Sequence, residues 1–226
     1  MDAADRAGER PVLAVCGLAF EAAIAAGPDV VTACGPRAAR LAAHLLQDAR
    51  GWAGVISFGC AGALDPGLPA GACVLASGVW TRQGVLPTDP AWLHALAARL
   101  PGARLGCVAG LDEPLLAGAD KMRLWRDSGA CAVDMESHVA ALAAQRHGLP
   151  FAACRVVLDP AGRIVPPCAL AGMRDDGTSA LLPLLRALAA SPRELGPLRA
   201  LAVDAWRARR TLREVRERLG PKLGAP

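Results

Sequence analysis

The sequence contains no tyrosine and only three phenylalanines, so aromatic side chains make up just 4% of its 226 residues. Proteins that bind single-stranded RNA stack bases on aromatic side chains, and this scarcity therefore argues against nucleic acid as a partner. The chain also lacks an uncharged apolar run of 18 residues, which a membrane-spanning helix would require. It has neither a GxGxxG nor a P-loop pattern, so no nucleotide cofactor is expected.

The eight cysteines are dispersed singly through apolar segments, without a CxxC pair or a Cys/His cluster. We therefore expect no metal site, and we expect the thiols to pack as small hydrophobic side chains. The first ten residues are charged and do not resemble a signal peptide. These features predict a cytoplasmic location in a reducing compartment.

Hydrophobic residues make up 53% of the chain and charged residues 20%, enough for one sizeable core. Short apolar segments alternate with helical patterns, which predicts a single α/β domain over residues 11–195. We expect a mostly parallel or mixed central sheet covered by helices on both faces. The predicted strands are residues 11–16, 29–34, 55–58, 72–79, 105–109, 131–133 and 151–158. The predicted helices are residues 21–26, 37–50, 90–100, 120–127 and 135–147.

Residues 196–226 form a basic extension, in which eight Arg and Lys side chains oppose three Asp and Glu. The segment has a net charge of +5 in a chain of net charge +4, so the rest is nearly neutral. We expect helical structure in the last part of the chain, interrupted by Pro183, Pro192 and Pro197. A basic amphipathic helix can lie on anionic lipid, or it can pack on the sheet with its arginines in solvent.

Two acidic residues occupy positions where a folded domain has little structural use for them. Glu136 lies in the first turns of an Ala-rich helix, and Asp159 closes the apolar strand over residues 151–158. Open α/β sheets bind ligands at the carboxyl ends of their strands, and burial would raise the pKa of a carboxyl there. Such an acid could donate a proton near neutral pH. The alternatives are a helix N-terminal acid for Glu136 and an Asx-Pro turn for Asp159.

Two further features follow predicted strands. Residues 57–63 contain two glycines, so they form either a loop whose N–H groups face a sugar or phosphate, or an ordinary tight turn. Glu21 follows the first strand by a few residues, and as an isolated residue it could equally be a solvated helix position.

The order of these motifs along residues 12–167 resembles the nucleoside phosphorylase and nucleosidase superfamily. Within it, the sequence is most similar to the hopanoid-associated branch, whose members are thought to remove adenine from adenosylhopane. The motifs that carry the resemblance are Cys16-Gly17-Leu18-Ala19-Phe20-Glu21, Gly59-Cys60-Ala61-Gly62, Leu68-Pro69-Ala70-Gly71, Val133-Asp134-Met135-Glu136 and Arg155-Val156-Val157-Leu158-Asp159.

The resemblance implies a role for each acid. Protonated Asp159 would donate to N7 of the purine, and Glu21 would orient and deprotonate the attacking water. Glu136 would accept hydrogen bonds from the ribose hydroxyls, and Met135 would pack beneath the ribose. It also implies substrate contacts for Gly59, Cys60, Ala61, Asp134 and Asp112.

The sequence departs from the phosphorylases, which commonly carry an Arg at the start of the glycine turn and a Ser within it. Here Ser57 and Cys60 occupy those positions, and Arg37 is a loose match for a phosphate-binding cation. We therefore favour water over inorganic phosphate as nucleophile, with Ser57 and Arg37 as the candidate phosphate contacts.

The resemblance implies a homo-oligomer without a metal or organic cofactor. Its substrate would be a small purine nucleoside, and a lipid-linked one would require contact with a membrane surface through the basic extension. The alternatives are a methylthioadenosine/adenosylhomocysteine-type nucleosidase, a purine nucleoside phosphorylase, and a nucleoside-binding protein without turnover.

Overall fold

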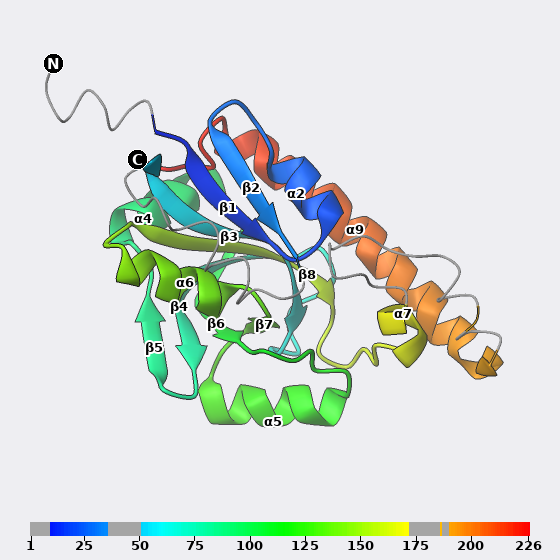
Figure 1. Ribbon diagram of the computed structural model, residues 1–226. Helices are drawn as coiled ribbons and strands as arrows, with labels where there is room; N and C mark the ends of the chain where they lie inside the picture. The colour runs from blue at the N-terminus through cyan, green and yellow to red at the C-terminus, as the bar shows by residue number, and fades with distance from the viewer. Residues whose placement is uncertain (1–9, 36–50, 172–185, 187–189) are drawn as a thin grey trace, which may run out of the picture.

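A computed structural model of the chain describes residues 10–35, 51–171, 186 and 190–226 (Figure 1). The predicted helix over residues 37–50, Arg37 and Pro183 lie outside these residues. None of the helices in the described part of the chain is long and apolar enough to cross a membrane.

The described strands form one mixed sheet in the order β2-β1-β3-β7-β6-β4-β5, with β8 paired to both β3 and β4. Five of its pairings are parallel and three are antiparallel. The prediction of a single α/β domain with a mixed central sheet is thus confirmed. The strands are β1 (Val12–Cys16), β2 (Val30–Cys34), β3 (Gly54–Ala63), β4 (Cys73–Thr81), β5 (Gly84–Pro87), β6 (Arg104–Gly110), β7 (Ala132–Asp134) and β8 (Phe151–Asp159).

The central strands are buried on both faces. In β1, Val12 and Ala14 pack into one apolar core, whereas Leu13 and Val15 pack into the other. Because side chains alternate between the faces of a sheet, a strand between two cores needs apolar residues in succession. This explains why β1 is a continuous apolar run in the sequence, and why β8 is one apart from Arg155 and the terminal Asp159.

Helices cover both faces of this sheet (Figure 1). α2, α4 and α9 contribute to the core on one face, and α6 packs against the other. The described helices are α2 (Ala19–Ala25), α4 (Pro90–Arg99), α5 (Gly118–Ser128), α6 (Ser137–Arg146), α7 (Pro167–Ala171), the 3-10 helix η2 (Pro192–Glu194) and α9 (Leu195–Leu219).

The C-terminal helix α9 lies beside α2 and packs on β8. It continues through Pro197, so the predicted interruption at that residue is wrong. A proline in the first helical turn removes an N–H group that has no partner within the helix, and it therefore does not break it. Beyond the helix, the backbone oxygen of Leu223 accepts a hydrogen bond of 3.1 Å from the buried indole of Trp92. This contact attaches the end of the chain to α4.

Strand β3 is longer than the sequence suggested. Residues 59–63 continue the strand, and the prediction of a glycine turn at this point is wrong. Here β3 pairs in parallel with β8 as far as Ala61 opposite Val157, with an irregularity between Ala61 and Gly62. The paired strand satisfies the backbone groups that a turn would otherwise have to satisfy locally. The glycine-containing segment is therefore the end of a central strand.

Candidate active site

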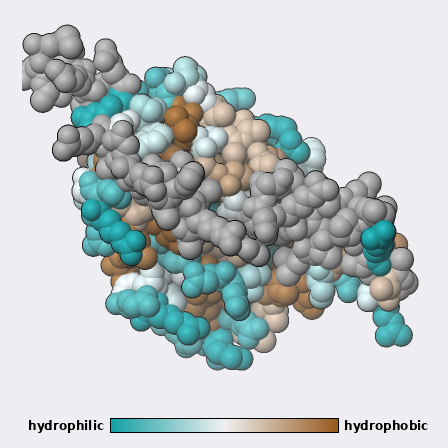
Figure 2. Space-filling view, in the orientation of Figure 1, coloured by the Kyte–Doolittle hydropathy of each residue, from teal (hydrophilic) through white to brown (hydrophobic). Residues whose placement is uncertain are grey.

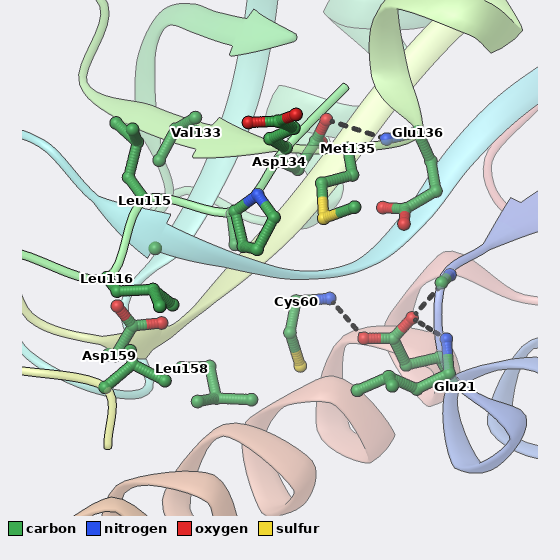
Figure 3. A pocket seen from close by; sticks show the side chains of 17 residues that line it. Glu21, Cys60, Leu115, Leu116, Val133, Asp134, Met135, Glu136, Leu158 and Asp159 are labelled. Atoms are coloured by element: carbon green, nitrogen blue, oxygen red, sulfur yellow. Dashed lines mark hydrogen bonds between the residues drawn. The ribbon is translucent and has the colours of Figure 1, made fainter. Parts of the chain in front are cut away.

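A cavity of about 190 Å³ lies where β1, β3 and β8 end and where β7 leads into α6 (Figure 3). Because β1, β3 and β8 run parallel, their carboxyl ends meet at one edge of the sheet, where α/β proteins place ligands. The residues that line the cavity are Gly17, Leu18, Glu21, Cys60, Ala61, Gly62, Glu113, Pro114, Leu115, Leu116, Val133, Asp134, Met135, Glu136, Leu158, Asp159 and Val165.

Glu21 is held by three backbone N–H groups. Its Oε2 atom accepts hydrogen bonds from Gly17 (2.9 Å) and Leu18 (3.0 Å), and its Oε1 atom accepts one from Cys60 (2.8 Å). The side chain is almost completely buried. Burial raises the pKa of Glu21, although the Arg155 guanidinium and the N–H groups of Cys60 and Leu18 oppose the rise. The carboxyl group is therefore fixed in one orientation at the edge of the cavity.

A buried arginine connects the strands beneath the cavity. Arg155, on β8, is completely buried, and its Nε atom lies 2.6 Å from Asp134 Oδ2. One of its terminal nitrogens lies 3.2 Å from Glu136 Oε2 and also donates to the hydroxyl of Ser57. The Ser137 hydroxyl in turn donates to Ser57 at 2.9 Å. A charged arginine is almost never fully buried unless it is paired, and here several acceptors satisfy it.

Asp134 fixes the beginning of α6. Its Oδ1 atom accepts hydrogen bonds from the backbone N–H groups of Ser137 (2.9 Å) and Glu136 (3.3 Å). A side chain that binds the free N–H groups of a helix N-terminus stabilises that end. Asp134 thus positions Met135 and Glu136, which point into the cavity (Figure 3).

Among the acids of the cavity, Glu136 is the one whose pKa is shifted most clearly. Burial, helped by the nearby Asp134 and Glu21, raises its pKa from the ordinary 4.5 to about 8 against the opposing effect of Arg155. Near neutral pH the carboxyl therefore carries a proton in a substantial fraction of molecules.

We expect Glu136 to make the protein less stable as the pH rises from about 4.5 to about 8. A group whose pKa is raised by folding stabilises the fold fully below its unfolded pKa, and this contribution is lost as the pH passes the folded pKa. Glu136→Gln cannot titrate and should flatten this decline, measured as the urea midpoint over a pH series. Glu217→Gln, at an exposed position of α9, is the control. An unchanged slope in Glu136→Gln would contradict the expectation.

At the other side of the cavity, Asp159 contacts a lysine. The Nζ atom of Lys121, on α5, donates to Asp159 Oδ2 and lies 3.4 Å from the backbone oxygens of Pro160 and Arg163. Both side chains are buried. Burial raises the pKa of Asp159, whereas the Lys121 ammonium opposes this rise.

Other predicted site residues are distributed around these acids. Cys60 and Ala61 line the cavity from β3, and Met135 lines it from the opposite side (Figure 3). Gly59 does not line it. An added Cβ on Gly59 would lie 2.5 Å from Glu21 Oε2, so this glycine leaves room for the Glu21 carboxylate.

Two predicted contacts lie away from the cavity. Ser57 is completely buried and bonded to Arg155 and Ser137, so it does not face a phosphate there. Asp112 is exposed and contacts His138 at 3.1 Å, although the four residues that follow it, 113–116, line the cavity. No cluster of metal-binding side chains occurs among the residues that the structure describes.

Two residues of this arrangement were given no role from sequence. Arg155 has a visible signal, because a single arginine within an apolar strand needs a buried partner. Lys121 has none, because it belongs to a polar helix that also contains Arg123 and Arg126. Only its contact with Asp159 at the end of β8, which the folded chain creates, distinguishes it from them.

The chain matches the phosphorylase superfamily over residues 6–171, more than half of its length, and it belongs to that superfamily of enzymes. No curated protein sequence matches the chain.

Several solved structures share the fold. The 5′-methylthioadenosine/S-adenosylhomocysteine nucleosidase of Helicobacter pylori aligns with a TM-score of 0.60 at 14% identity, over 68% of this chain and 86% of that chain. The futalosine hydrolase of the same organism gives the same four values. The nucleosidase of Streptococcus pneumoniae aligns with a TM-score of 0.57 at 21% identity, over 67% of this chain and 87% of that chain.

Proposed function

We propose that this protein hydrolyses the N-glycosidic bond of a purine nucleoside. The observation that carries the proposal is the placement of Asp159 and Glu21 at two sides of one cavity, with Met135 and Glu136 between them (Figure 3). Asp159 delivers a proton to the purine as the bond breaks, and Glu21 orients and deprotonates the water. Glu136 accepts hydrogen bonds from the ribose, which strengthen as positive charge develops on the sugar.

The ligands of the structural neighbours support a purine. A mutant of the H. pylori nucleosidase holds 5′-methylthioadenosine in its active site, and the Colwellia psychrerythraea nucleosidase was solved in complex with adenine. The S. pneumoniae nucleosidase was solved with 8-aminoadenine.

The charge of the cavity favours water over phosphate. Five of the described lining residues are acidic, and none of them is Arg, Lys or His. An added anion would meet these carboxylates, and the neighbouring cations Lys121 and Arg155 are already paired with three of them, so a further negative charge is unfavourable in this buried site. Among the residues that the structure describes, the buried Arg155 is already engaged by Asp134, Glu136 and Ser57.

We further propose an apolar 5′ substituent, such as the hopane of adenosylhopane. Apolar side chains line much of the cavity, and among them are Leu18, Leu115, Leu116, Leu158 and Val165. The resemblance of the sequence to the hopanoid-associated branch also favours a hopane as the 5′ substituent. The alternative within the same chemistry is a methylthioadenosine/adenosylhomocysteine nucleosidase.

Release of free adenine from a set of 5′-substituted adenosines tests the proposal, with and without inorganic phosphate. We expect adenine and free ribose derivative in both buffers, and faster turnover when the substituent is a long apolar group. Dependence on phosphate would indicate phosphorolysis. Binding of these nucleosides without any adenine release would instead identify a non-catalytic binding protein.

A lipid-linked substrate requires access to a membrane, and α9 offers a suitable surface. Its side opposite the sheet exposes Leu195, Val203 and Trp206, of which Trp206 is 63% exposed. Arg199 and Arg213 are exposed on the same helix. An amphipathic helix with Trp and Arg on its outer side can lie at the surface of an anionic bilayer. We therefore propose peripheral membrane contact through α9.

Replacing Arg199 and Arg213 together by Gln should weaken binding to vesicles that contain phosphatidylserine. Each cation near such a surface contributes about 1 kcal/mol, so we expect a loss of about 2 kcal/mol, which co-sedimentation at low salt would detect. The control replaces Arg123 and Arg126, two exposed arginines of α5, by Gln. Absence of vesicle binding by the unaltered protein at low salt would contradict the proposal.

A further inference from the structure

Lys121 is the buried residue of an otherwise exposed or half-buried helix. The outer side of α5 is hydrophilic (Figure 2), whereas Lys121 is 0% exposed and directed at the end of β8. Its ammonium group faces three oxygen acceptors, which are Asp159 Oδ2 and the backbone oxygens of Pro160 and Arg163. An ammonium group has three N–H donors, so this environment can satisfy it completely.

Lysine is a rare residue in this chain, in which nearly all basic residues are arginines. Only Lys121 and Lys222 are lysines, although the chain has 25 basic residues. An arginine could hold the same positive charge, but its guanidinium does not release a proton in proteins, whereas a buried lysine can. The buried partner of Asp159 is therefore one of the few basic residues here that can act as a proton donor.

The contact with Lys121 also affects whether Asp159 carries a proton. A carboxylate that accepts a hydrogen bond from an ammonium group carries no proton of its own, yet the departing purine needs one. We propose that Lys121 supplies this proton through Asp159. Lys121 thereby positions the Asp159 carboxyl and protonates it. The inference rests on the proposed function.

The proposed transfer is balanced. An Nζ–H bond of Lys121 breaks as an O–H bond forms on Asp159, and that O–H bond breaks as the N–H bond of the leaving purine forms. Lys121 is left as a neutral amine and Asp159 as a carboxylate. The attacking water loses its proton to Glu21. After the products leave, Glu21 releases this proton to solvent and Lys121 regains one from solvent, which restores the starting state.

Other ionisable groups act on the same pair. Asp204 of α9 raises the pKa of Asp159 further, and it forms an ion pair of 2.7 Å with Arg163. The Cys60 thiol and Glu113 face the cavity from β3 and from the segment before α5. Since Lys121 lowers the pKa of Asp159 against the effect of burial, its removal leaves a carboxyl that is protonated up to a higher pH.

The test compares Lys121→Met and Lys121→Arg with the unaltered protein, using 5′-methylthioadenosine as the probe. The kcat/KM for adenine release is measured from about pH 5 to about pH 9, the range over which a shifted carboxyl titrates. Lys121→Met should approach the unaltered protein within about tenfold at the acidic end, where Asp159 carries its own proton, and fall by at least about 10²-fold at the alkaline end. Lys121→Arg should be impaired by about 10²-fold or more at every pH, because arginine holds Asp159 as a carboxylate without releasing a proton.

Lys222→Met is the matched control, because it removes the other lysine of the chain at a position outside the cavity. An equal loss in Lys121→Met at every pH would indicate a purely structural role and overturn the inference. Full activity of Lys121→Arg would overturn it as well.

Failure of the proposed function gives a different result, namely no adenine release by the unaltered protein. In that case a carbon-13 NMR titration of the Asp159 carboxyl tests, without substrate, whether Lys121 controls the protonation of Asp159. The inference requires the protonation midpoint of Asp159 to be higher in Lys121→Met than in the unaltered protein, and an unchanged midpoint would overturn it.

Discussion

Asp159→Asn is expected to lower kcat for adenine release by about 10²–10⁴-fold, the usual contribution of a general acid. Asparagine has nearly the same size and still accepts a hydrogen bond from Lys121, but it cannot relay a proton to the purine. The KM should change much less, because the ribose contacts through Glu136 remain. Single-turnover measurements with excess protein separate the chemical step from binding.

The control is Asp127→Asn, which makes the same chemical change at an exposed position on α5. Its kcat should equal that of the unaltered protein. Full activity of Asp159→Asn in the same assay would show that another group protonates the leaving purine.

Arg155→Met is expected to lower the free energy of unfolding by about 3–5 kcal/mol, the cost of breaking a buried ion pair from one side. Methionine fills a similar volume but leaves Asp134 and Glu136 as buried acids without their cation. The side chain also links β8 to Ser57 on β3, a residue 98 positions earlier in the chain. Urea denaturation followed by circular dichroism measures the loss.

Arg104→Met is the matched control on another strand. Its guanidinium is largely exposed and lies 3.7 Å from Asp65, so its ion pair is weak. We expect a change of about 0–1 kcal/mol for this variant. Equal losses in the two variants would mean that the buried network beneath the cavity adds no stability of its own.

Much of the fold could be predicted because burial on both faces leaves a clear pattern. Strand β1 is a continuous apolar run of the right length, and β8 is one apart from Arg155 and the Asp159 that closes it. The end of β3 could not be predicted in this way. Gly59 and Gly62 suit a turn and a strand equally well, and only the pairing with β8 favours the strand.

The site was predictable to a similar degree. Asp159 was singled out because it closes an apolar strand, Glu136 because it begins an Ala-rich helix, and Glu21 through the family resemblance. The structure places all three around one cavity. The sequence did not indicate Lys121, because the pattern of α5 is that of an ordinary amphipathic helix. Nor did it show that Ser57 would be bound by Arg155, since the contact joins residues on two strands that are far apart in the chain.

The position of β3 between β1 and β8 has a consequence for how the protein folds. Glu21 reaches its final contact with Cys60 across 39 residues, and Asp159 joins the cavity only when β8 pairs with β3. Each of these contacts closes a long loop, whose entropic cost is met before the contact stabilises the fold, so we expect them to form late. Adenine release is therefore expected to return only with the last stage of refolding, after helical circular dichroism has recovered, and no fragment that lacks β1 or β8 should show it.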